Sequence, residues 1–119
     1  MKLLSRWFRH ASMPPSWIEP AALATRLEQD DAPLILDVRG PDEFTGPLGH
    51  IREATNVPLI ELSAHLHDLV PEEWPVVVVC KTDRRSSMAA QQLQDAGLSD
   101  VAVLRGGMER WRGLGLPVN

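Results

Sequence analysis

The feature that most constrains the fold is the stretch PVVVVCKTDRRSS, which spans residues 75–87 and contains the only cysteine of the 119-residue chain. Four consecutive valines are too few to cross a membrane and too β-branched to favour a helix, so they predict a strand buried on both faces of a sheet. Cys80 then ends a central strand. Residues 81–85 include no apolar side chain, and helical spacing resumes over 86–96 at Ala89, Leu93 and Ala96.

A cysteine between a strand and a helix is well placed to bind an anion. Open α/β sheets bind ligands beyond the carboxyl ends of their strands, where backbone N–H groups at the start of a helix face the ligand. A thiol reacts as its thiolate, which helix N-termini and basic side chains stabilise. Here Lys81, Arg84 and Arg85 are basic, and successive N–H groups from Lys81 to Ser86 can curl around an anion. We therefore expect Cys80 to be a nucleophile, rather than the small buried hydrophobe that most free cysteines are.

Further apolar runs alternate with helical patterns along the chain. Short strands are expected at 17–18, 34–38, 55–57 and 101–104, and they are bounded by turn residues. Helices are expected after Pro20, over 59–69 up to Pro71, and after Gly106-Gly107, and a helical turn within 40–49. This alternation predicts an α/β fold, with a parallel sheet covered by helices on both faces.

Composition limits the classes of function. A chain of this length fits one domain, and its net charge of −4 argues against a nucleic-acid-binding protein. No window reaches the roughly 18 apolar residues of a membrane span, and no signal-peptide core is present. One cysteine cannot form an internal disulfide, so a reducing cytoplasm is the expected compartment.

Residues 1–16 are expected to form an extension in front of a domain of residues 17–119. Residues 2–11 place apolar side chains on one helical stripe and hold three of the twelve Lys and Arg residues, without any acid. This asymmetry hints at a peripheral membrane or protein contact. We favour the simpler interpretation of a frayed extension, or of a helix docked on its own domain. The apolar stripe comprises Leu3, Leu4, Trp7, Phe8 and Ala11.

Seven short blocks occur in the order that is typical of one family. They are LILDVR (34–39), Glu43-Phe44, Gly49-His50-Ile51, ATNVP (54–58), the strand end Val76–Cys80, Arg85-Ser86, and Arg105-Gly106-Gly107 followed by Trp111. Together these blocks resemble the single-domain rhodaneses, over nearly the whole chain from Trp17 to Val118. The resemblance implies a five-stranded, mostly parallel sheet with helices on both sides, and sulfurtransferase chemistry at the cysteine.

The resemblance also assigns roles to individual residues. Cys80 matches the sulfur-accepting nucleophile, and Asp37 and Arg39 match a supporting charged pair. Two positions depart from the family pattern, because Asp83 and Glu53 stand where glycine is common. Aspartate tolerates a left-handed backbone, but its charge would lie near the anion. The remaining residues of the active-site loop are Lys81, Thr82, Asp83, Arg84, Arg85 and Ser86.

These residues predict sulfur transfer in two steps. The Cys80 thiolate takes the outer sulfur of a donor such as thiosulfate, and an acceptor thiol or cyanide then removes it from the resulting persulfide. Because no second cysteine exists, the acceptor must be a small thiol or a partner protein. Arg85 is expected to anchor the loop or the donor anion, and the Ser86 hydroxyl to donate to the sulfur. No metal or organic cofactor is expected.

Two other functions remain open at this point. A cysteine-dependent phosphatase or arsenate reductase also holds an anion beside a thiolate, but its loop has five residues between cysteine and arginine. Here four residues separate Cys80 from Arg85, and the smaller loop favours sulfur transfer. A non-catalytic binding module is the other alternative, although such modules usually lack the cysteine.

Some polar and aromatic residues have simpler interpretations. A mutual ion pair that pins two loops is at least as favoured for Asp37 and Arg39 as direct catalysis. His50 is expected to fix a loop by hydrogen bonding rather than to act as a general base. His65 and His67 are expected to face solvent. Four tryptophans are expected to pack within the domain: Trp7, Trp17, Trp74 and Trp111.

Overall fold

The computed structural model describes residues 14–69 and 74–119, so the predictions for residues 2–11 and for Pro71 lie outside the described residues. Five strands form one sheet in the order β1-β5-β4-β2-β3, and every neighbouring pair is parallel. The predicted α/β fold is confirmed, and the sheet is wholly parallel. The strands are β1 (Ser16–Ile18), β2 (Leu34–Asp37), β3 (Thr55–Asn56), β4 (Val76–Val79) and β5 (Val101–Leu104).

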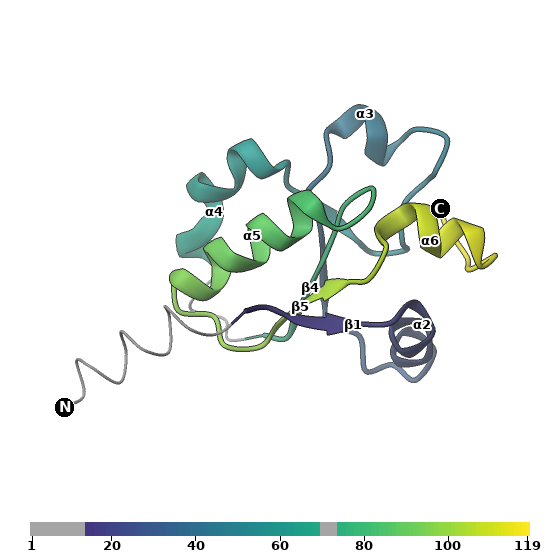
Figure 1. Ribbon diagram of the computed structural model, residues 1–119, viewed down its shortest axis with the longest axis horizontal. Helices are drawn as coiled ribbons and strands as arrows, with labels where there is room; N and C mark the ends of the chain where they lie inside the picture. Colours follow the sequence, from purple (N-terminus) through teal and green to yellow (C-terminus); the bar gives the residue numbers. More distant parts are fainter. Residues whose placement is uncertain (1–13, 70–73) are drawn as a thin grey trace.

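Helices cover both faces of the sheet, and α5 and α2 lie on opposite sides of the strands in Figure 1. One face packs against α4 and α5, and the other packs against α2 and α6. Among the described residues, no helix is long and apolar enough to cross a membrane. The helical segments are α2 (Pro20–Glu28), α3 (Pro41–Phe44), the 3-10 helix η1 (Leu59–Glu61), α4 (Leu62–Leu69), α5 (Arg84–Asp95) and α6 (Gly107–Gly113).

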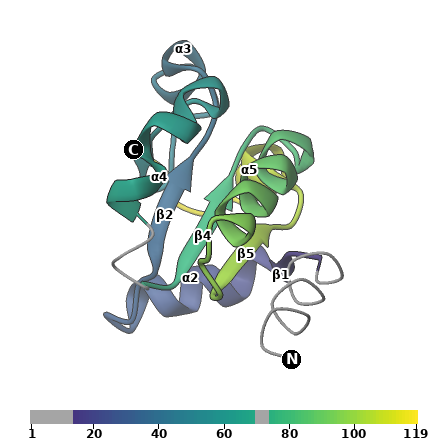
Figure 2. The same ribbon diagram turned by 90° about the vertical axis from the view of Figure 1, so that its left-hand side faces the viewer.

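Strand β4 lies between β5 and β2 in the sheet, as the adjacent ribbons in Figure 2 show, and all four of its valines are buried. Successive side chains of a strand point to opposite faces. Val76, Val78 and Cys80 therefore belong to the core under α4 and α5, whereas Val77 and Val79 belong to the core under α2 and α6. The prediction of a strand buried on both faces, with Cys80 at its end, is confirmed.

Two predictions about the helix after Cys80 were wrong. The helix begins at Arg84, two residues before Ser86, because the first turn of a helix can face solvent and so shows no apolar spacing. Ala96 is not part of the buried stripe, because it lies at the exposed C-cap of α5. The buried side chains of α5 are Ser86, Ala89, Ala90 and Leu93.

The expectation that the tryptophans pack inside the domain is confirmed only for Trp111, which is 1% exposed. Trp17 and Trp74 are 43% and 54% exposed. Trp17 lies on β1 at the edge of the sheet, where the guanidinium of Arg105 lies 4.8 Å from its ring centroid. Trp7 lies outside the described residues. A large aromatic side chain on an edge strand can thus pack against a cationic side chain at the surface instead of in the core.

The two positions where the family pattern has glycine differ in backbone conformation. Glu53 has a φ of 67°, in the left-handed region that favours glycine, so its departure from the pattern is strained. Asp83 has a φ of −148°, so it needs no tolerance of that region. Of the two positions, only Glu53, in the turn before β3, has a backbone conformation that is strained by the absence of glycine.

Candidate active site

Cys80 directly follows β4, and residues 81–83 lead from it into α5. The first turn of α5 brings Ser86 back to the cysteine, and the Ser86 Oγ lies 3.2 Å from the Cys80 Sγ. Both residues are buried, with Cys80 1% exposed. The sulfur therefore has a hydroxyl within hydrogen-bonding distance at the carboxyl end of the central part of the sheet, as the sequence predicted.

The start of α6 fixes the backbone of this loop. The Met108 N–H donates to the Cys80 carbonyl oxygen at 2.9 Å, and the Glu109 N–H donates to the Lys81 carbonyl oxygen at 3.0 Å. Gly107 has a φ of 57°, and a Cβ on it would lie 2.5 Å from the Cys80 oxygen and 2.6 Å from the Lys81 carbonyl carbon. Only glycine fits this contact, so the Gly106-Gly107 pair supports the loop as well as turning the chain.

The amide side of the loop is left without backbone partners. None of the six successive N–H groups from Lys81 to Ser86 has an oxygen acceptor within the described ranges, whereas the Ser87 N–H donates to the Asp83 oxygen. Successive unpaired N–H groups at the start of a helix can bind an anion. The loop can therefore hold a negatively charged group beside Cys80 without first breaking a hydrogen bond of its own.

Asp37 and Arg39 form a buried ion pair at the end of β2, each 1% exposed. The Arg39 Nη2 lies 2.7 Å from the Asp37 Oδ2, and the Arg39 Nε donates to the Asp37 Oδ1 at 2.9 Å. Arg39 also donates to the carbonyl oxygens of Glu43 and Gly49, at 3.1 Å and 2.8 Å. The predicted mutual ion pair is confirmed, and it holds the α3 loop against the sheet.

Glu43 was not predicted as a site residue. Its carboxylate accepts hydrogen bonds from both terminal nitrogens of Arg85, at 2.6 Å and 2.9 Å. These bonds, helped by the Gly40 N–H, lower the pKa of Glu43 from 4.5 to about 2, although burial opposes the shift. The sequence places Glu43 in a family block, but no local pattern pairs it with a residue 42 positions later. Arg85 thus anchors α5 to α3, which is one of the two roles expected for it.

His50 has the structural role that the sequence predicted. Its Nδ1 lies 2.8 Å from the Phe44 carbonyl oxygen, and the two rings stack with centroids 3.8 Å apart. The histidine therefore fixes the loop after α3. His65 and His67 are exposed on α4, as expected.

A cavity of about 410 Å³ lies beside the cysteine loop, and residues from the segment after β2, from α3 and the loop after it, from the cysteine loop and from α6 line it. Lys81, Thr82 and Arg84 are exposed, whereas Asp83 and Arg85 are half-buried. The structure thus places residues that follow β2 and β4 at one opening, as expected for neighbouring parallel strands. The lining residues are Arg39, Glu43, Pro47, Leu48, Lys81 and Glu109.

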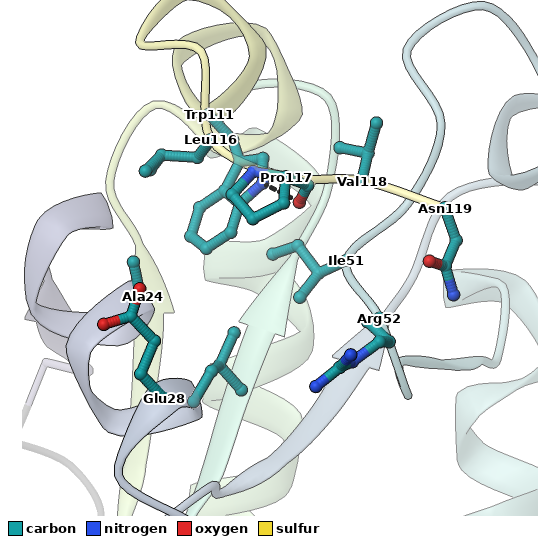
Figure 3. A pocket seen from close by; sticks show the side chains of 10 residues that line it. Ala24, Glu28, Ile51, Arg52, Trp111, Leu116, Pro117, Val118 and Asn119 are labelled. Atoms are coloured by element: carbon teal, nitrogen blue, oxygen red, sulfur yellow. Dashed lines mark hydrogen bonds between the residues drawn. The ribbon is translucent and has the colours of Figure 1, made fainter.

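A second cavity, of about 280 Å³, lies between α2 and the last residues of the chain (Figure 3). Its lining includes Ile51 and Trp111, which belong to the core under α2 and α6. The Trp111 indole N–H donates to the Pro117 carbonyl oxygen at 2.9 Å, shown as a dashed line in Figure 3. None of the predicted site residues lines this cavity, whereas Arg39 and Lys81 line the first one.

The sequence comparison decides the family. A family model described as "Rhodanese-like domain" matches residues 19–114. The chain belongs to the rhodanese-like domain family. This confirms the resemblance drawn from the seven blocks, and the sheet and helices agree with solved rhodanese-like structures.

Several curated relatives of this rhodanese-like domain carry sulfur-transfer names. A sulfurtransferase of Allochromatium vinosum is 31% identical over 101 residues, which cover 85% of this chain and 92% of the relative. Thiosulfate sulfurtransferase GlpE of Pseudomonas putida is 30% identical over 93 residues, with 78% and 82% covered. The chain spans only 50% and 60% of the length of two other curated relatives.

A solved structure from Rhodopseudomonas palustris, described as a protein of unknown function and possible tyrosine phosphatase, superposes on this rhodanese-like domain with a TM-score of 0.81. The two sequences are 25% identical, and the match covers 88% of this chain and 85% of the other. The fold is therefore shared between proteins with sulfurtransferase names and a protein with a possible phosphatase name.

Proposed function

We propose that this rhodanese-like domain is a sulfurtransferase that carries sulfane sulfur on Cys80 as a persulfide. The observation that carries the proposal is the loop from Lys81 to Ser86, whose six N–H groups have no oxygen acceptor within the described ranges, next to a cysteine. A persulfide is an anionic, polarizable group that such amides can stabilise. The sulfurtransferase names of relatives from Allochromatium vinosum and Pseudomonas putida support the same chemistry.

The first step transfers one sulfur atom from a donor of the thiosulfate type. The Cys80 thiolate attacks the outer sulfur, a new S–S bond forms, and the S–S bond of thiosulfate breaks as sulfite leaves with its electron pair. The Ser86 hydroxyl lies where it can donate to the sulfur anion. Asp37 and Arg39 act as supporting residues, because their ion pair fixes the loop that lines the opening.

The second step passes the sulfur to an acceptor outside the chain. An acceptor thiolate attacks the outer sulfur of the persulfide and restores the Cys80 thiolate, so no oxidant or reductant is consumed. The chain has no second cysteine that could resolve the persulfide. A small thiol or a protein acceptor in a reducing cytoplasm fits this requirement. Relatives named "Putative sulfur carrier protein YrkF" and "Adenylyltransferase and sulfurtransferase uba4" support a protein acceptor.

We further propose that residues 17–119 form the catalytic domain and that residues 1–16 are an accessory extension. The family match begins at residue 19, and the sheet begins one residue before the proposed boundary, because β1 starts at Ser16. Deletion of residues 1–13 should leave sulfur transfer unchanged.

Phosphate-ester hydrolysis is the competing chemistry, given the possible phosphatase among the structural relatives. In this chain both terminal nitrogens of Arg85 already bind Glu43, and four residues separate it from Cys80. These two features favour sulfur transfer, because the arginine fork that would clamp a phosphate group is occupied.

Intact-mass measurement tests the proposal directly. After exposure to thiosulfate, the protein should gain the mass of one sulfur atom, and a thiol should remove it. The Cys80→Ser variant should gain nothing, whereas a substitution at the exposed Met88 on α5 serves as the matched control and should behave as the wild type. Release of phosphate from a generic phosphoester, with no sulfur added to Cys80, would overturn the proposal.

A further inference from the structure

Arg85 is the basic residue of the loop whose charge is most completely paired. Its two terminal nitrogens meet the two carboxylate oxygens of Glu43 in a bidentate arrangement, at 2.6 Å and 2.9 Å. Both side chains are half-buried, with 36% and 39% of their surfaces exposed. Bidentate pairs of this kind fix direction as well as distance. The guanidinium therefore points toward α3, and both of its terminal nitrogens are already hydrogen-bonded to Glu43.

The carboxylate of Glu43 is presented from a fixed support. The Arg39 guanidinium donates to the Glu43 carbonyl oxygen at 3.1 Å, and Arg39 is itself held by the buried Asp37 carboxylate. The Gly40 N–H donates to the Glu43 Oε1 at 3.3 Å. Since the short helix α3 is tied to the end of β2 in this way, Glu43 can hold Arg85 without moving to meet it.

Arg85 is adjacent in sequence to the residue that contacts the Cys80 sulfur. Arg85 directly precedes Ser86, whose hydroxyl is 3.2 Å from the Cys80 sulfur. The pKa of the Arg85 guanidinium is raised, first by its hydrogen bonds to Glu43 and further by the charges of Cys80 and Asp37, although burial opposes the shift. Because Arg85 lies in the same first turn of α5 as Ser86, which contacts the Cys80 sulfur, a positive charge released from Glu43 would act near an anion held in the loop.

We propose that Glu43 is a positioning residue of the site: by holding both terminal nitrogens of Arg85, it fixes the first turn of α5 and keeps the guanidinium out of the anion-binding loop. This inference rests on the proposed sulfur-transfer function. It assigns donor binding to the backbone N–H groups and to the exposed Lys81 and Arg84, so that a sulfite product is not retained by an arginine fork. Glu43 thereby favours turnover over tight binding of the donor.

The test separates binding from turnover in the Glu43→Gln variant. Freed from its carboxylate, Arg85 should form charge-assisted hydrogen bonds to the donor, so the thiosulfate KM should fall about tenfold. The kcat should fall about tenfold as well, because the first turn of α5 is no longer fixed and the anion leaves more slowly. A purely structural role of Glu43 would lower kcat and raise KM.

Two variants serve as controls. Asp42→Asn removes the same charge from the neighbouring exposed position of α3, which none of the described side-chain contacts joins to Arg85, and it should change neither constant more than twofold. In an Arg85→Met background, Glu43→Gln should produce no gain in affinity, because the residue that it frees is absent. A gain that persists in that background would overturn the proposal.

Binding of inorganic sulfate to Cys80→Ser protein, measured by calorimetry, gives a readout that needs no turnover. Adding Glu43→Gln should tighten sulfate binding about tenfold. Unchanged or weaker binding would refute the positioning role, even if the wild type transfers sulfur. Conversely, tighter sulfate binding together with no sulfur labelling of the wild type would retain the Glu43–Arg85 inference and reject the proposed function.

Discussion

The support of the cysteine loop by α6 makes Gly107 the most sensitive glycine to test. An alanine Cβ at this position would overlap the Thr82 carbonyl oxygen and lie 2.5 Å and 2.6 Å from Cys80 and Lys81 backbone atoms. All three neighbours are backbone, so no flexible side chain can move aside. The loop or the start of α6 must shift, and the two hydrogen bonds from Met108 and Glu109 are then lost.

The size of the effect of Gly107→Ala follows from three unfavourable contributions and one that offsets them. The left-handed backbone, with φ of 57°, costs a non-glycine residue about 1 to 2 kcal/mol. Forcing a methyl group into a packed contact costs about 1 to 3 kcal/mol. Loss of two hydrogen bonds adds about 2 kcal/mol, and the lower entropy of the unfolded alanine chain returns less than 1 kcal/mol. We expect the free energy of unfolding to fall by about 3 to 7 kcal/mol, or about 5 kcal/mol at the midpoint of these ranges.

Two other glycines of the same region provide matched controls. Gly113 lies in α6 with open space around its Cβ position, and Gly113→Ala should be neutral or slightly stabilising. Gly115 also has open space but a φ of 74°, so Gly115→Ala should cost only about 1 kcal/mol. Urea unfolding of the three variants measures the differences. If Gly107→Ala costs no more than Gly115→Ala, backbone strain alone acts and the packing argument is wrong.

Three further predictions concern charge and backbone strain. Arg39→Met should lower the free energy of unfolding by about 3 to 5 kcal/mol, because it leaves the buried Asp37 carboxylate without its ion-pair partner. The double variant Asp37→Asn/Arg39→Met should lose less stability than Arg39→Met, and an equal or larger loss in urea unfolding would contradict this. Glu53→Gly should raise the thermal midpoint by relieving about 1 kcal/mol of left-handed strain, less the entropy of glycine, whereas Glu53→Ala should give no such gain; equal midpoints for both would argue against strain. The Glu43 carboxylate has its pKa lowered from 4.5 to about 2, so its pairing with Arg85 stabilises the fold above pH 4.5 and is lost as the pH falls toward 2. Since both side chains are more than a third exposed, the difference between wild type and Glu43→Gln should be about 1 kcal/mol at pH 7. It should be mostly lost at pH 2, the folded-state pKa of Glu43, and absent below it in unfolding titrations; a difference that persists below pH 2 would have another cause.

The sequence predicted best where a single local pattern determines the structure. Four β-branched residues between polar segments gave β4 and the position of Cys80, because no helix or exposed strand accommodates such a run. Alternation of strands and helices gave the parallel sheet. The start of α5 was placed too late, since the polar residues Arg84 and Arg85 occupy a solvent-facing first turn that hydrophobic spacing does not report.

The parts of the site that were missed depend on contacts between distant segments. No spacing rule in the sequence links Glu43 to Arg85. Their pairing depends on the position of α3, which Arg39 fixes by donating to the Glu43 carbonyl oxygen. The role of Gly107 was only half predicted, because the sequence indicated a turn but not that Thr82 and Cys80 backbone atoms fill the space beside it. Such contacts are set by how three loops meet at one edge of the sheet.

The meeting of these loops follows from the strand register. Asp37 pairs with Val79 in the parallel β2–β4 ladder, so the residues after these strands leave the sheet at the same level. Arg39 and Lys81 consequently line one cavity, and α6 reaches the loop because β4 also pairs with β5. The carbonyl oxygens of Cys80 and Lys81 are then held by α6, and α5 is held by α3, while the N–H groups of residues 81–86 have no oxygen acceptor among the described residues. The anion site that we propose thus depends on where three parallel strands end, and a change in α3, which contacts Arg85 and not Cys80, should still affect the cysteine loop.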